Sequence, residues 1–139
     1  MAEQVVVPLF PCSFSGGERN IPAGSRVILG LGWEANNRGL VQDFLRAQTT
    51  RVVVGDGEPV DISNSYGAIE PTPNGNFRSR VRHDTGVTLA AGDALAVRGV
   101  MALSHLVHDG FTLADEDTHR PMFFGPGEEF TFACRVTAT

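Results

Sequence analysis

The sequence lacks the motifs that most often identify an enzyme. It contains no glycine-rich phosphate-binding loop, no Gly-x-Ser-x-Gly nucleophile elbow, no Cys-x-x-Cys pair and no His-Glu-x-x-His zinc motif. Each of these motifs holds reactive groups at the spacing that one kind of reaction requires. We therefore expect no catalytic residue, no cofactor and no enzymatic activity.

Features that would direct the chain to a membrane or a nucleic acid are also missing. No apolar run approaches the ~18 residues that a membrane-spanning helix needs. The first residues, MAEQVVVPLFPC, show no basic segment followed by a long apolar stretch, so no signal peptide is expected. The formal charge of −5 disfavours general binding to nucleic acids and to anionic membranes. These absences predict a protein made in the cytoplasm.

Cysteine is scarce, with only Cys12 and Cys134 near opposite ends of the chain. A disulfide requires the first and last strands to be neighbours. Cys134 shares a strand face with Phe130, Phe132 and Val136, which is typical of a small buried hydrophobe. We therefore expect unpaired cysteines in a reducing compartment.

Short strand patterns fill most of the sequence. The 16 Gly and 8 Pro fit many tight turns, and apolar residues recur two apart along several segments. We predict an all-β, mainly antiparallel fold of about seven or eight strands, arranged as one β-sandwich or jelly-roll-like domain over residues 1–139. A partly closed barrel is the alternative. The first strand, residues 3–10, is expected at a sheet edge because Pro8 cannot donate to a ladder, and the last strand is expected at another edge.

The segment 32–50 differs because its apolar residues have helical spacing. Leu40, Val41, Phe44 and Leu45 fall on one side of a helix, and Asn36 or Asn37 can cap its start. We predict one short helix over about residues 36–48 that crosses between strands. Phe44 and Trp33 are expected to be the largest buried side chains.

Three groups of residues could carry chemistry, and each has a simpler interpretation. Asp84-Thr85-Gly86 resembles the short motif of aspartic proteases, but Val81-Arg82-His83 before it is not an apolar strand, so we expect a polar strand end. The histidines and acids of 105–119 lack a complete ligand set for zinc or calcium, so we expect a solvated acidic loop and no metal. Ser104 and His105 would point apart on a strand and could not act together.

Two other features predict contacts with proteins. The segment 105–125 is a long polar loop with Phe123 and Phe124 at its end, which could anchor the loop to the core or contact another subunit. Arg78, Arg80 and Arg82 alternate along one strand and stand on one face. They could pair with residues 115–117, face solvent, meet carboxylates of a neighbouring subunit or bind phosphate.

Together these observations favour a non-enzymatic structural protein that binds into a larger protein assembly. Its partners would be protein subunits, either copies of itself or a larger structural protein. The specific hypothesis is a small virion protein of a tailed phage, such as a capsid decoration or another head or tail component. The alternative is a carbohydrate-recognition module with Trp33, Tyr66 or His83 in a cleft.

Overall fold

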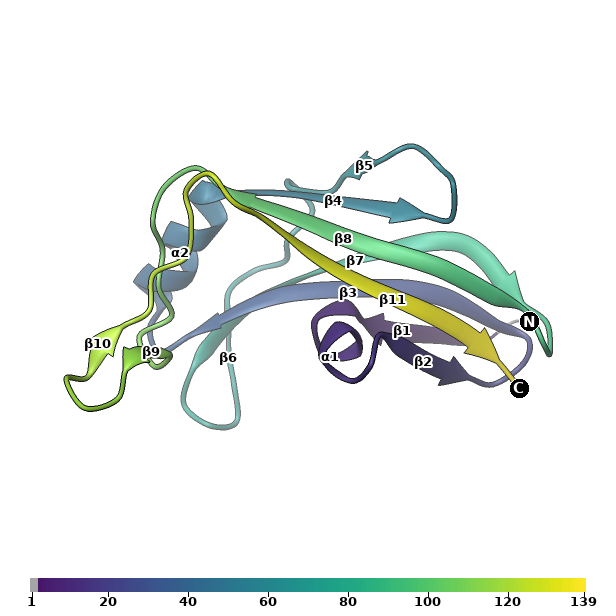
Figure 1. The fold of residues 1–139 in the computed structure, drawn as a ribbon, viewed down its shortest axis with the longest axis horizontal. Coiled ribbons are helices and arrows are strands. Elements are labelled where there is room, and N and C mark those ends of the chain that lie inside the picture. Colours follow the sequence, from purple (N-terminus) through teal and green to yellow (C-terminus); the bar gives the residue numbers. More distant parts are fainter. Residues whose placement is uncertain (1–2) are drawn as a thin grey trace.

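Two larger β-sheets and a small hairpin contain most of the chain in the computed structural model, which describes residues 3–139 (Figure 1). The four-stranded sheet has the order β1 (Gln4–Pro8), β3 (Ser25–Ala35), β7 (Phe77–Leu89), β6 (Glu70–Pro71). The five-stranded sheet has the order β2 (Glu18–Ile21), β11 (Glu129–Ala138), β8 (Ala94–Leu103), β4 (Gln48–Val54), β5 (Val60–Asp61). The hairpin pairs β9 (Leu113–Asp115) with β10 (Arg120–Pro121).

Six of the eight strand pairings are antiparallel, whereas β1 pairs with β3 and β2 pairs with β11 in parallel. The prediction of a mostly β, mainly antiparallel fold is thus confirmed, although the sheets are mixed. The jelly-roll topology within that prediction is not confirmed. More strands are present than predicted because β2, β6, β9 and β10 have only two to four residues each, too few to show a clear period.

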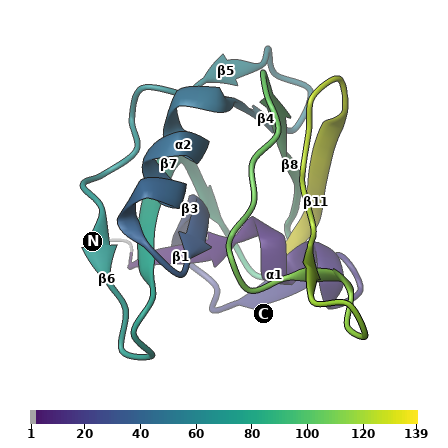
Figure 2. The ribbon, with the colours of Figure 1, turned by 90° about the vertical axis from the view of Figure 1, so that its left-hand side faces the viewer.

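The core lies between the two larger sheets, which face each other in a sandwich-like arrangement (Figure 2). One buried cluster joins side chains of both sheets, among them Val27, Leu29, Leu31, Val81, Val97, Cys134 and Val136. On β3 and β11 these are alternate residues, and on β11 the buried face is the one predicted from the sequence, with Cys134 and Val136 in the core. Full burial of an aliphatic side chain contributes about 1.5–3 kcal/mol, and this cluster is therefore the main source of stability.

The predicted helix is α2 (Arg38–Ala47), which lies across one end of the sandwich (Figure 2). The Asn37 side chain caps it by accepting a hydrogen bond from the Leu40 N–H at 3.0 Å. Phe44 is fully buried, as predicted, and its ring stacks on that of Trp33 at 4.6 Å between centroids. Trp33 itself is only half-buried, because it borders a cavity described below.

The segment from Leu9 to Asn20 corrects the sequence prediction of a strand end followed by a loop. It contains the short helix α1 (Leu9–Phe14) and then the strand β2. Leu9 and Cys12 are three residues apart and both buried, which is helical spacing over less than two turns. β1 lies at a sheet edge as predicted. The prediction for the last strand is wrong, because β11 lies between β2 and β8.

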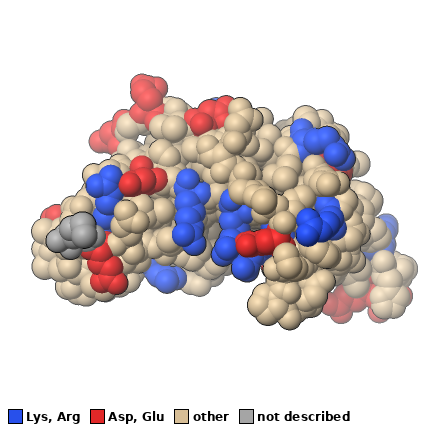
Figure 3. Space-filling view, turned by 180° about the vertical axis from the view of Figure 1, so that it is seen from behind, with Lys and Arg blue, Asp and Glu red and all other residues tan. Residues whose placement is uncertain are grey.

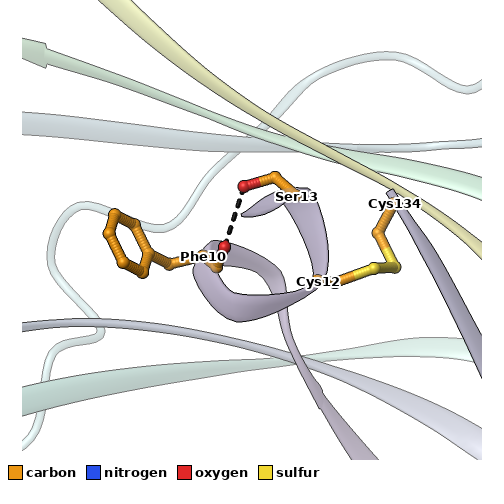
Figure 4. Close-up of a disulfide and its surroundings, with 4 residues drawn as sticks. All are labelled: Phe10, Cys12, Ser13 and Cys134. Atoms are coloured by element: carbon orange, nitrogen blue, oxygen red, sulfur yellow. Dashed lines mark hydrogen bonds between the residues drawn. A yellow bond between two sulfur atoms is a disulfide. The ribbon is translucent and has the colours of Figure 1, made fainter. Parts of the chain in front are cut away.

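The prediction of unpaired cysteines is also wrong, because a disulfide joins Cys12 to Cys134 (Figure 4). Helix α1 brings Cys12 against β11, where the two Cα atoms lie 5.8 Å apart. Figure 4 shows that Cys12 points from α1 toward β11, while Phe10 points to a different side of the same helix. The disulfide therefore fixes a helix that the sequence pattern had not revealed.

Candidate functional site

A large apolar groove opens along one side of the sandwich. Its volume is about 820 Å³, and it lies between α1, the β3 edge, β11 and the 105–125 loop. The apolar part of its lining includes Leu31, Trp33, Met101, Leu103, Phe130 and Phe132. A cleft of this size with a mainly apolar lining and few polar groups is typical of a binding site.

The groove exists because the neighbouring strands are shorter than the strands that they accompany. β1 is paired with β3 only as far as Gly30, whereas β3 continues to Ala35. In the same way β2 pairs only with residues 135–138 of β11, which begins at Glu129. Both large sheets therefore present an uncovered strand edge at the same side of the molecule.

Helix α1 forms one wall of the groove and exposes two aromatic rings. Phe10 is 53% and Phe14 75% exposed, and their ring centroids are 4.8 Å apart. Phe10 also lies 5.6 Å from Phe132 at the base of the groove. These residues were not among the predicted site residues, although their separation of four positions, opposite the buried Leu9 and Cys12, is the spacing of one helix face. Exposed apolar side chains gathered beside a cleft are typical of interaction sites.

The 105–125 loop forms the opposite wall of the groove. Its adjacent residues Phe123 and Phe124 have different surroundings. Phe124 pairs with Val107 in an isolated antiparallel bridge, and its ring meets the Trp33 ring edge-on at 5.5 Å. Phe123 is 49% exposed, and its ring centroid lies 5.0 Å from that of His108. Phe124 is thus the anchor to the core, and Phe123 is the member available to another molecule.

Arg78, Arg80 and Arg82 stand on one face of β7, as the alternation predicts. Arg78 and Arg80 pair with Glu70, at 3.1 and 2.7 Å, and not with residues 115–117. The hydrogen bond from Arg78, together with the charges of both arginines, lowers the pKa of Glu70. Figure 3 shows basic side chains, all of them arginine in this sequence, spread over the side of the molecule that carries β6 and β7. Arg82 has no ion pair within the described part of the chain.

Asp84-Thr85-Gly86 lies in an irregular part of β7 rather than in a paired-carboxylate site. Asp84 forms an ion pair with Arg26 at 2.8 Å and accepts a hydrogen bond from the Gly86 N–H at 2.9 Å. The Arg26 hydrogen bond is the main reason that the pKa of Asp84 is lowered. The arrangement explains the short motif as strand structure.

Ser104 and His105 correct one expectation, since they do approach each other. β8 ends at Leu103 and the chain then bends, so the Ser104 Oγ lies 3.4 Å from His105 Nδ1, while His105 Nε2 contacts Asp43 at 2.9 Å. The first distance exceeds the ~2.6–3.2 Å typical of an activated nucleophile. Neither residue lines the groove. Ser104, His105 and Asp43 thus form a chain of polar contacts at the end of β8, outside the groove.

The other histidines and acids of this region are dispersed. Across residues 3–139 no three side chains of His, Cys, Asp or Glu lie close enough together to hold a metal ion. The buried Asp109 uses its carboxylate to accept hydrogen bonds from the Phe111 and Thr112 N–H groups, which shapes the loop.

Comparisons with protein-family models, with curated proteins and with solved structures find no match to this chain. Neither α1 nor α2 has the length and apolar character needed to cross a bilayer. Inferences about function therefore rest on the geometry of the groove and on the sequence.

Proposed function

We propose that this protein is a non-enzymatic structural component that binds other protein subunits through the apolar groove. The observation that carries the proposal is the coincidence, at one place, of two uncovered strand edges and exposed aromatic walls. Exposed strand edges pair with other chains unless they are covered, charged or twisted, so edges that stay open are available to bind another protein.

The particular assembly that we propose is the virion of a tailed phage, where the chain would be a capsid decoration or another small head or tail protein. Small size, the lack of catalytic motifs and the sandwich-like fold support this part of the proposal. The disulfide adds support for a final location outside a reducing cytoplasm, because such bonds persist mainly in oxidising surroundings.

The geometry counts against the carbohydrate-binding alternative. Sugar platforms need an exposed aromatic face, but one face of Trp33 is covered by the parallel Phe44 ring. Tyr66 is half-buried and packs against the core, and its hydroxyl hydrogen-bonds to the Thr50 hydroxyl at 3.0 Å. Three of the exposed phenylalanines, Phe10, Phe14 and Phe111, line the groove, where they suit apolar protein side chains.

The test of this function is photo-crosslinking in the cells or particles where the chain occurs. A photoreactive phenylalanine analogue replaces Phe14 in the groove or, as the control, Val60, an exposed apolar residue on β5 outside it. We expect a discrete protein adduct from Phe14 but not from Val60, in material that sediments as a large particle. A chain that sediments alone and gives no protein adduct from Phe14 would contradict the proposal.

A further inference from the structure

The uncovered part of β3 directs unpaired backbone groups into the groove. The Arg26 N–H bonds to Glu3 on the β1 side, and alternate residues of an extended strand point the same way. Gly32 and Glu34 therefore direct their N–H and C=O groups toward the side that β1 has left. No backbone hydrogen bond to another segment is found there for either residue within residues 3–139.

Two further contacts fix this orientation. Arg80 of β7 lies directly opposite Gly32, but its C=O accepts a hydrogen bond from the Gly67 N–H at 2.8 Å, on the side of β7 away from β3. At the end of β3, the Asn36 N–H donates to the Asp109 C=O at 2.8 Å. The loop thus already occupies the next position along the edge, and the vacant length lies between Gly30 and Asn36.

Glycines on β3 allow arginines from the neighbouring strand to reach this edge. Gly30 and Gly32 lie opposite Arg82 and Arg80, and all four residues line the groove. A Cβ at Gly32 would lie 3.2 Å from the Arg80 Cγ, so the arginine stem occupies the space that a side chain would need. A strand added to β3 would lie about 9.6 Å from β7, two strand spacings away. An arginine and a carboxylate can bridge that distance across Gly32, because β3 has no side chain there. Gly30 is still paired with Pro8 of β1, and the Val6 side chain lies against it, so the open position is Gly32 alone.

The charge at this edge is not neutralised within the chain. Glu70 of β6 forms ion pairs with Arg78 and Arg80. Arg82 has no carboxylate partner among residues 3–139. Of the two acids in the groove lining, Glu34 accepts a hydrogen bond from Asn76 at 2.8 Å, and Asp109 is engaged within its own loop. The outer face of the edge therefore carries three arginines, Arg78, Arg80 and Arg82, against the two carboxylates Glu34 and Glu70, and this excess of one positive charge favours a negatively charged group.

We infer that the groove binds an extended segment of a partner protein, which adds to β3 as a strand and alternates apolar residues with carboxylates. The apolar side chains would enter the cavity beside Leu31 and Trp33, because inward and outward positions alternate along a strand. A carboxylate opposite Gly32 would meet Arg80 across that glycine and Arg82 diagonally, two residues further along β7. The inference rests on the proposed function and specifies the chemistry of the partner.

The experiment is selection of peptides from a random dodecapeptide library on the intact, oxidised protein. We expect enrichment of sequences in which Val, Ile, Leu or Phe alternates with Asp or Glu. The best peptide is then titrated against wild type, Arg82→Gln and the matched control Arg98→Gln, whose arginine is exposed and lies outside the groove. We expect about three- to tenfold weaker binding to Arg82→Gln and unchanged binding to Arg98→Gln, since a charge-assisted contact is lost only in the former. Amide hydrogen exchange should slow at Gly32 and Glu34 in the complex.

Three results would overturn the inference. Equal weakening by Arg82→Gln and Arg98→Gln would show that general charge, not the edge, attracts the peptide. Bound peptides that leave the exchange of Gly32 and Glu34 unchanged would show that no strand is added. A failure to enrich any peptide, or self-association of the chain at this surface, would exclude the proposed occupant. The proposed function is judged separately by the Phe14 crosslink, which does not depend on the chemistry of the partner.

Discussion

Removal of the Cys12–Cys134 disulfide gives the sharpest test of the fold. The bond closes a loop with a sequence separation of 122 residues, so it restricts almost the whole unfolded chain. The loop-closure relation gives a stabilisation of about 5 kcal/mol for a loop of this length at 25 °C. Since small domains are stable by only ~5–15 kcal/mol, the loss would leave the protein close to its unfolding threshold.

The perturbation is made in two ways that share few side effects. Cys12→Ala/Cys134→Ala removes both sulfur atoms, whereas a reductant keeps them in place and breaks only the bond. Urea unfolding followed by the fluorescence of Trp33, the sole tryptophan, measures the free energy of unfolding in each case. We expect both forms to lose about 4–5 kcal/mol, with the alanine variant slightly less stable because it also leaves a small cavity.

The local effect should be greatest at α1. The Gly17 N–H donates to the Cys12 C=O at 2.9 Å, and the Ser15 N–H donates to the Pro11 C=O at 3.0 Å. Without the covalent link to β11, we expect faster amide exchange at Ser15 and Gly17 than in β8. A loss below about 1 kcal/mol in both forms, with unchanged exchange in α1, would refute the view that this bond fixes the helix.

Three further predictions follow from single contacts. Burial raises the pKa of Tyr66 to about 12. Because Tyr66 is the sole tyrosine, ultraviolet titration should show one transition well above pH 10. The free energy of unfolding should fall as pH rises from 10 to 12, because the tyrosine of the unfolded chain ionises first. A transition near pH 10 in the folded protein would contradict the burial of its hydroxyl. Phe124→Ser should lower the free energy of unfolding by about 2 kcal/mol and Phe123→Ser by less than about 0.5, which thermal melting of the two variants side by side can check. Asn37→Ala should cost about 1 kcal/mol through loss of the cap on α2, and a melting temperature equal to that of wild type would show that the bond to Leu40 contributes nothing.

Elements with a long, regular pattern could be predicted from the sequence. α2 was readable because its apolar face, its cap and the β-branched run after it agree. The turns before β3 and β8, and the one that leads into β11, share a glycine. The structure gives Gly24, Gly92 and Gly127 φ values of 85°, 87° and 88°, which is the left-handed conformation that such turns require.

Elements that are short, or that depend on distant partners, could not be predicted. α1 is six residues long and begins directly after the strand pattern of β1, so its helical spacing was absorbed into the strand. The parallel pairings of β1 and β2 join residues from different parts of the chain and leave no local signal. The disulfide was missed for the same reason, since only α1 and β11 together bring the cysteines within reach.

The candidate site shows the same limit. Phe123 and the arginines of β7 were identified because an exposed aromatic in a polar loop and a row of like charges are local features. The groove itself depends on where β1 and β2 stop, which is a property of two pairings and not of any one segment. Phe10 and Phe14 gain their role only once α1 is placed between the sheets.

The short length of β1 and β2 is informative in its own right. Sheet edges attract other chains, and proteins usually cover, charge or twist them. This chain covers one half of each edge with β1 and β2 and fills the space between the sheets there with a helix held by a disulfide. The neighbouring half of β3 has Gly32 where a larger side chain would stand between an approaching strand and β7, and Arg80 lies directly opposite this glycine. A sequence selected only against aggregation would be expected to protect that length as well. Its open state is the reason that we propose a partner strand at this position.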